Sequence, residues 1–180
     1  LLGAGLLWFG WYGFNAGSAF SANELAGIAL ATTSSASGAA ALAWIFLDAA
    51  RGIKPSALGL SIGLVVGLVA ITPAAGFVTV PHSVIIGVVA SVISRLVVDW
   101  RTKSKLDDTL DVFPCHGVGG IVGMLFTGIF ATKTINSAVT TDGLYYGQTG
   151  LFVSHLIGLV IATVFTLVMA FIVLKVTDLI

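Results

Sequence analysis

Six long stretches of apolar residues dominate this sequence, and they restrict its fold more than any other feature. They cover residues 1–20, 28–50, 56–72, 83–100, 111–131 and 151–176. A helix needs about 20 apolar residues to cross the hydrocarbon core of a bilayer, and each stretch reaches or approaches that length. Lipid-facing β-strands would instead alternate apolar and polar residues in segments of about ten. The chain is therefore predicted to be an all-α integral membrane protein with six transmembrane helices.

The composition agrees with a membrane protein. Of the 180 residues, 57% are hydrophobic and 9% are charged, and the mean hydropathy is +1.07. Soluble domains carry about 25% charged residues. The formal net charge is zero and no run of basic residues occurs, which argues against a nucleic-acid partner. Leu1 opens on an apolar stretch without a methionine or a signal-peptide pattern, so we expect the chain to be part of a longer protein.

The basic residues predict the orientation of the helices. Seven of the eight fall in or beside the second and fourth connections or at the C-terminus, and only Lys133 lies on the other side. The seven are Arg51, Lys54, Arg95, Arg101, Lys103, Lys105 and Lys175. Because cytoplasmic loops carry the excess of lysine and arginine, these loops and the C-terminus are predicted to be cytoplasmic. The first helix then starts inside and ends outside.

The segment 111–123 places a histidine inside an apolar helix. His116 is about five residues into that helix, roughly 7 Å from its start, and so lies in the cytoplasmic half of the membrane. An ionisable side chain there is costly and usually functional; the alternative is a hydrogen bond to a serine, threonine or carbonyl. Three glycines that follow, Gly119, Gly120 and Gly123, favour close approach of another helix. We expect that helix to bury the imidazole ring.

The residues before this histidine resemble the start of a helix. Asp108 is a plausible N-cap, and Asp111 is expected to act as a capping carboxylate near the positive helix end. Pro114 suits an early helical position. Thr72 and Pro73 mark the end of the third helix, because proline lacks the N–H that the next turn needs.

Three side chains of the first helix share one face. Trp11, Phe14 and Ser18 have the spacing i, i+3, i+7. One interpretation is an interfacial aromatic belt beside the packing glycines Gly10 and Gly13. The other is a cation site at the outer end of the helix, because aromatic faces and a hydroxyl lone pair both attract a cation.

Other polar and aromatic residues have simpler structural interpretations. Trp44 is expected to be an interfacial anchor, and Asp48 is expected to pair with Arg51 at the cytoplasmic edge. His82 follows a proline in an outer loop and is expected to be solvated. His155 lies on the outer side of the sixth helix, where packing or helix–helix hydrogen bonding is expected.

The sequence contains no pattern typical of a metal site or an enzyme. Cys115 precedes His116 directly and so points away from it, and no second histidine follows three or four positions later. No nucleophile has a base on its own face. We therefore expect no catalytic residue, no metal and no cofactor.

Three segments resemble the ammonium transporter (Amt/Mep/Rh) family, in its bacterial or archaeal Amt branch. They are residues 10–18, 67–76 and 111–120, and the resemblance extends over the whole chain. It implies an eleven-helix fold built from two inverted five-helix repeats and a last long helix. Residues 1–180 would form one transmembrane domain, the second repeat with the last helix. It also implies a homotrimer with one pore per subunit.

The resemblance also implies a role for each matching residue. The partner histidine, the second gate phenylalanine and other recruitment residues would belong to the first repeat. In this chain the implied roles are ammonium recruitment at the outer mouth for Trp11 and Ser18, a phenylalanine gate for Phe14, a pore histidine for His116, pore lining for Thr72 and Val112, and a structural role near the pore for Asp111.

The implied function is transport of ammonium or ammonia across the cell (inner) membrane, with deprotonation and a histidine relay in the lumen. The implied partners are the substrate, the lipid bilayer and a cytoplasmic PII-type signalling protein. An alternative function is ammonium sensing by a membrane domain coupled to a signalling module. A structural scaffold would explain the glycines but not Trp11, Phe14, Ser18 and His116 together.

Overall fold

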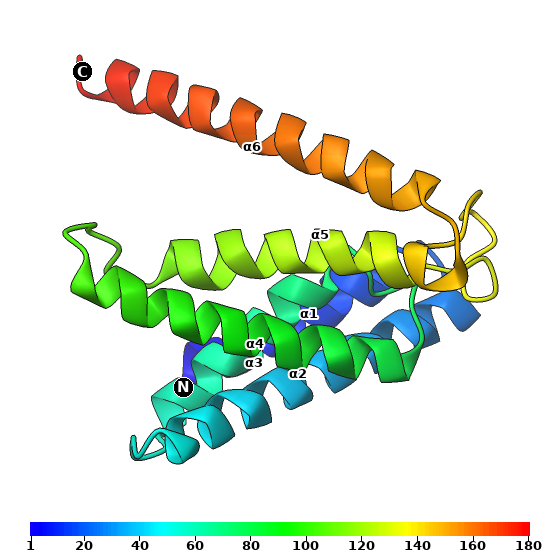
Figure 1. Cartoon of the computed structure of the whole chain (residues 1–180), viewed down its shortest axis with the longest axis horizontal. Coiled ribbons are helices and arrows are strands. Elements are labelled where there is room, and N and C mark those ends of the chain that lie inside the picture. The colour runs from blue at the N-terminus through cyan, green and yellow to red at the C-terminus, as the bar shows by residue number, and fades with distance from the viewer.

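The computed structural model describes residues 1–180 as an all-helical chain, which confirms the predicted fold class (Figure 1). Its elements are α1 (Leu2–Gly17), α2 (Glu24–Ala50), α3 (Ala57–Ile71), α4 (Val80–Lys103), the π-helical turn η1 (Phe113–Val118), α5 (Gly119–Phe130), the 3₁₀ turn η2 (Leu144–Tyr146) and α6 (Gly150–Thr177). Four of the helical segments, namely α2, α4, η1 with α5, and α6, are long and apolar enough to cross a membrane. The helices α1 and α3 are shorter.

Local chemistry explains where several helices begin and end. The side chain of Asn23 accepts a hydrogen bond from the backbone N–H of Ala26, and Ser56 does the same for Gly59. These are N-caps, which satisfy backbone donors that have no partner within the helix. Pro81 lies in the first turn of α4, where its missing N–H has no cost. Each helix begins and ends within a few residues of the apolar stretch from which it was predicted.

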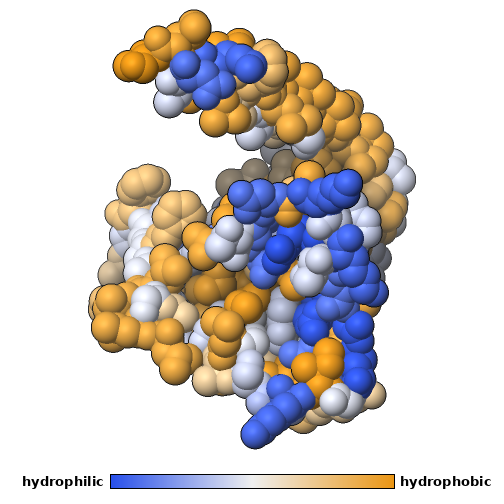
Figure 2. Space-filling model, turned by 90° about the vertical axis from the view of Figure 1, so that its left-hand side faces the viewer, coloured by the Kyte–Doolittle hydropathy of each residue, from blue (hydrophilic) through white to orange (hydrophobic).

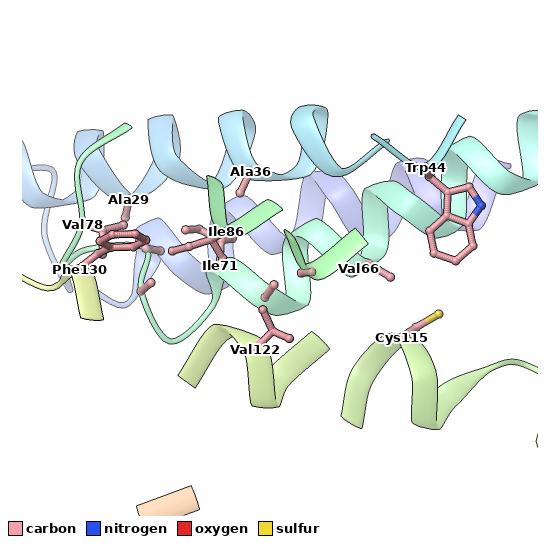
Figure 3. Close-up of a cluster of buried hydrophobic side chains, with 14 residues drawn as sticks. Ala29, Ala36, Trp44, Val66, Ile71, Val78, Ile86, Cys115, Val122 and Phe130 are labelled. Carbon is pink, nitrogen blue, oxygen red and sulfur yellow. The ribbon is translucent and has the colours of Figure 1, made fainter. Parts of the chain in front are cut away.

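The interior lies between α2, α3, α4 and α5. Ala36 on α2, Ile71 on α3 and Val122 on α5 all belong to one buried apolar cluster (Figure 3). The backbones approach closely where side chains are small: a Cβ added to Gly87 of α4 would lie 2.2 Å from the carbonyl oxygen of Ala36. Small residues therefore allow the backbones of α2 and α4 to pack closely against each other.

The last helix diverges from the bundle (Figure 1). No residue of α6 is buried within this chain, and the helix contacts α5 near its own N-terminus. There the ring Nδ1 of His155 lies 3.0 Å from the carbonyl oxygen of Met124, and Gly128 of α5 packs against Phe152. The expectation of helix–helix hydrogen bonding by His155 is confirmed.

The connections predicted to share one side of the membrane do lie at one end of the molecule. The α2–α3 loop, the α4–η1 loop and the C-terminus are all at the left of Figure 1. Figure 2 views this end and shows hydrophilic residues gathered over part of it, with apolar surface on either side. The α5–α6 loop lies at the opposite end, as the alternation of the helices requires.

A network of ion pairs joins α2 to α4 at this hydrophilic end. Arg95 donates from Nε to Asp48 at 2.7 Å and also pairs with Asp99, which in turn lies 2.5 Å from Arg51. The prediction that Asp48 pairs with Arg51 is therefore wrong, because the guanidinium that reaches Asp48 belongs to Arg95 of α4. Trp44 is not an interfacial anchor either: it is 3% exposed, and the Arg95 guanidinium lies 5.6 Å from its ring centre.

An aspartate organises the loop between α5 and α6. The backbone N–H of Lys133 donates to Asp142 Oδ1 at 2.7 Å, and the N–H of Asp142 donates to Gln148 at 2.9 Å. The Lys133 N–H, with smaller contributions from the Thr132 hydroxyl and the Lys133 charge, lowers the pKa of Asp142 below its ordinary value. The charged carboxylate is therefore the form that the folded loop prefers.

Because the folded loop prefers the charged carboxylate of Asp142, we expect acid to destabilise the loop. Because the folded pKa of Asp142 is the lower one, its contribution to stability is complete above the ordinary aspartate pKa of about 3.9. That contribution is lost as the pH falls through the folded pKa. Amide hydrogen exchange, corrected for its intrinsic pH dependence, should show protection at Lys133 declining in acid. The Asp142→Asn variant, which does not titrate, should show a flat profile; a decline of equal size in that variant would contradict the assignment.

Candidate functional site

His116 lies in a π-helical turn rather than in a regular α-helix. The turn Phe113–Val118 leads directly into α5, and single π turns often occur at functional sites. Cys115 is buried and points into the interior (Figure 3), whereas His116 is exposed on the chain. The two side chains therefore diverge as expected. The predicted burial of the imidazole is not found within this chain: Gly119 and Gly123 pack against α3, whereas Gly120 contacts no other helix and lines the same open depression as His116.

Two aspartates make different contacts at the start of this segment. Asp108 accepts hydrogen bonds from the backbone N–H groups of Val112 at 2.8 Å and Phe113 at 2.9 Å. The capping role expected of Asp111 is wrong, because its carboxylate pairs with Arg101 at the end of α4. Asp111 has a φ of +52°, a conformation in which aspartate is more common than most residues. The ion pair thus fixes the point at which the chain turns back into the helix.

An open depression brings together four of the residues predicted from the sequence. It has a volume of about 340 Å³, and its lining includes Trp11, Phe14, Thr72 and His116. Trp11 of α1 donates a hydrogen bond from its indole Nε1 to the Thr72 hydroxyl at the end of α3, at 2.7 Å. Three segments far apart in the chain, α1, α3 and η1, therefore meet at one place.

A second, smaller cavity adjoins the first on the side of the α5–α6 loop. Its volume is about 240 Å³, and its lining includes Phe14, Asn15, Ser18 and Thr72. Phe14 and Thr72 line both cavities, one of which contains Ser18 and the other His116. Trp11, Phe14 and Ser18 do lie along one face of α1, as their spacing predicted. The glycines beside them have no atom within 4 Å of an added Cβ, so the packing interpretation finds no support within this chain.

Val112 lies apart from these two cavities. It is 50% exposed and lines a third depression of about 500 Å³ with Arg101 and Phe113, at the hydrophilic end of the molecule. Val112 precedes the π-helical turn and therefore lies closer to the hydrophilic end than His116 does.

The structural roles of two polar residues at the end opposite the C-terminus were not predicted from the sequence. His82 is not a solvated loop residue: it lies in the first turn of α4 and stacks on Phe130, with ring centres 4.2 Å apart. Asn15 is 9% exposed and donates from Nδ2 to the Thr33 hydroxyl at 3.0 Å. A carboxamide in the last turn of an apolar helix was the signal that could have identified it.

The fold and these cavities define a multi-pass membrane protein in which aromatic and hydroxyl side chains line two cavities, one of them beside an exposed histidine. The chain belongs to the ammonium transporter family: it matches the Ammonium Transporter Family over residues 1–180.

Individual relatives agree with this assignment. The chain is 49% identical over 173 residues to a putative ammonium transporter of Methanothermobacter thermautotrophicus, which covers 96% of this chain and 42% of that protein. The crystal structure of Saccharomyces cerevisiae Mep2 superposes with a TM-score of 0.93 at 36% identity, covering 99% of this chain and 41% of Mep2. A solved sensor Amt protein superposes with a TM-score of 0.76 at 32% identity, over 89% of this chain and 39% of that protein. The chain thus spans about two fifths of the length of these relatives.

One glycine holds the histidine segment against α3. A Cβ added to Gly123 would lie 2.1 Å from the carbonyl oxygen of Ala70 and 3.0 Å from Pro73, so Gly123→Ala must push α5 away from α3. Overpacking of this kind costs about 1–3 kcal/mol, and we expect a clear fall in the melting temperature of the detergent-solubilised protein. Gly120→Ala is the matched control, because nothing lies within 4 Å of its added Cβ. Equal melting temperatures for the two variants would refute the close contact.

Proposed function

We propose that the protein containing this chain transports ammonium or ammonia across the membrane through a hydrophobic pore. Ammonium is recruited at the outer mouth beside Ser18 and Trp11, passes the Phe14 gate, and gives up its proton before or at the lumen histidine His116. Thr72 and Val112 line or border the path, and Asp111 holds the histidine segment in place.

The observation that carries this proposal is that two cavities share lining residues. The outer one contains Ser18, the inner one contains His116, and both are lined by Phe14 and Thr72. This sharing supports a path from Ser18 to His116 that passes Phe14. Family membership supports the same substrate, since the relatives named above include a putative ammonium transporter.

Electrostatics explains why deprotonation belongs in the path. Moving a small cation from water into a medium of low dielectric constant costs of order 20 kcal/mol before relaxation. Aromatic faces and hydroxyl lone pairs offset part of this cost at the mouth. Neutral ammonia avoids the rest, whereas potassium has no proton to lose. An imidazole suits the relay because its pKa lies near neutrality and its ring can both donate and accept.

Flux measurements on the complete protein test the proposal. Proteoliposomes that contain it should show a current or an internal pH change on addition of ammonium chloride, and none with potassium chloride. Empty liposomes supply the background of ammonia that crosses lipid unaided. A signal no larger than this background would refute transport.

Ammonium sensing is the second candidate function. It is favoured by the similarity to a sensor Amt protein over 89% of the chain. A sensor would bind ammonium at the same outer cavity without passing it to the other side. Binding without flux in the experiment above would select this function.

The proposed setting is the cell (inner) membrane, with the C-terminus cytoplasmic and three copies in a homotrimer. The basic loops support that orientation, because they share one end of the molecule with the C-terminus. The absence of buried residues from α6 within this chain supports contact of that helix with lipid or with other parts of an assembly. A PII-type signalling protein would bind at the cytoplasmic end.

A further inference from the structure

We propose that Asn15 is a cation-binding residue of the outer cavity, with its side-chain oxygen Oδ1 as a direct acceptor for an N–H of ammonium. The inference deepens the proposed function and rests on it, because it names an additional specificity-determining residue of the same recruitment cavity.

The orientation of the Asn15 carboxamide is set by its neighbour on α2. Thr33 has a single hydroxyl proton, and Thr33 donates it to the carbonyl oxygen of Ala29 at 2.6 Å. The Thr33 oxygen can then only accept, so the atom 3.0 Å away must be the NH₂ group of Asn15. Oδ1 is therefore the opposite atom of the carboxamide. It accepts no hydrogen bond within the chain, and it is not among the enclosed polar atoms that lack a partner.

The neighbouring hydroxyls of the cavity are also restricted to accepting. Ser18 donates its proton to the carbonyl oxygen of Phe14 at 2.6 Å, and Thr72 donates to that of Leu68 at 2.7 Å. Each hydroxyl oxygen keeps lone pairs, although Thr72 shares one with Trp11. Asn15, whose Nδ2 is turned to Thr33, lines the same cavity of about 240 Å³ as Ser18 and Thr72.

Such a set of oxygens matches a small cation that has only donors. Ammonium offers four N–H groups and no lone pair, whereas an anion needs donors from the protein. Asn136, on the loop side of the cavity, is the one exception among these polar side chains. Its Oδ1 accepts from the N–H of Ala138 at 3.0 Å, which leaves its NH₂ group free.

The decisive variant is Asn15→Leu, which keeps the side-chain size and removes the acceptor. A hydrogen bond to a charged group lost in this way should raise the half-saturating ammonium concentration about tenfold to a hundredfold. The maximum rate should change little, because His116 and the gate are intact. Flux is measured in proteoliposomes over a range of ammonium chloride concentrations, and ammonium binding to the solubilised complete protein is measured by calorimetry.

A second variant tests the orientation without touching Asn15. Thr33→Val removes the oxygen that fixes the carboxamide, so the half-saturating concentration should rise at least about twofold, the factor for equal population of both orientations. Thr163→Val is the matched control: Thr163 makes the same bond to the carbonyl four residues back, at 2.7 Å, but lies exposed on α6. This pair decides the question if Asn15→Leu does not fold.

The outcomes separate this inference from the proposed function. Wild-type half-saturation in Asn15→Leu, or a fall only in maximum rate or melting temperature, would overturn the role of Asn15 while transport stands. If the wild-type protein binds ammonium but shows no flux, the proposal of transport is overturned. The role of Asn15 is then tested by binding: Asn15→Leu should raise the dissociation constant for ammonium by the same factor. If it neither binds nor conducts, both proposals are overturned.

Discussion

Replacing His116 with alanine should reduce ammonium-specific flux through the complete protein by at least about 100-fold, the contribution of a positioned acid–base group. The imidazole lies in the inner cavity with Trp11, Phe14 and Thr72, and it is the only ring there that has a nitrogen lone pair to accept a proton and a second nitrogen to return one. An alanine leaves the cavity open but removes that exchange. A residual current that no longer distinguishes ammonium from potassium would be the second expected sign.

His155→Ala is the matched control for this variant. The His155 ring is bonded to the carbonyl oxygen of Met124 between α5 and α6 and lines neither of the two cavities. Its removal should leave ammonium-specific flux close to that of the wild-type protein. Unchanged ammonium-specific currents in His116→Ala would contradict the proposed relay.

Replacing Arg95 with methionine should destabilise the fold by about 3–5 kcal/mol, the usual cost of removing one partner from a buried ion pair. The Arg95 side chain is 11% exposed and lies between Asp48 and Asp99, and the Asp48 side chain is 8% exposed. Without the guanidinium, two carboxylates remain at the α2–α4 contact with only Arg51 nearby. The packing of Arg95 over Trp44 is lost as well.

Thermal unfolding in detergent checks this expectation. Lys175→Met is the matched control, because Lys175 and Asp178 are 3.7 Å apart with side chains 64% and 70% exposed. Exposed pairs of this kind contribute about 1 kcal/mol or less. A melting temperature for Arg95→Met as high as that of Lys175→Met would show that the buried network does not stabilise the fold.

Much of the fold could be predicted because its determinants are local. Apolar stretches interrupted by proline, glycine and charged residues predicted six helices, and the structure has them within a few residues of the expected bounds. The same holds for the end of the molecule at which the basic loops gather. Motif spacing also placed Trp11, Phe14 and Ser18 on one face of α1.

The partners of buried polar residues could not be predicted in the same way. Asp48 was expected to use Arg51, three positions away, and instead uses Arg95 across the helix interface. Trp44 and His82 were expected at an interface or in solvent, and both pack against residues of other helices. In each case the sequence pattern describes one helix, whereas the partner depends on how two helices are rotated against each other.

The sequence by itself determined the helices, their boundaries and which connections share one end of the molecule, because hydrophobicity, capping and charge act within each segment. Only the tertiary structure decided that Trp11 donates to Thr72, that Phe14 lines two cavities, and that a π turn places His116 in the lining of one of them. The physical reason is that each of these contacts joins different helices; the contact of α5 with α3, for example, depends on close approach at Gly123. Such an approach depends on the surfaces of two helices at once.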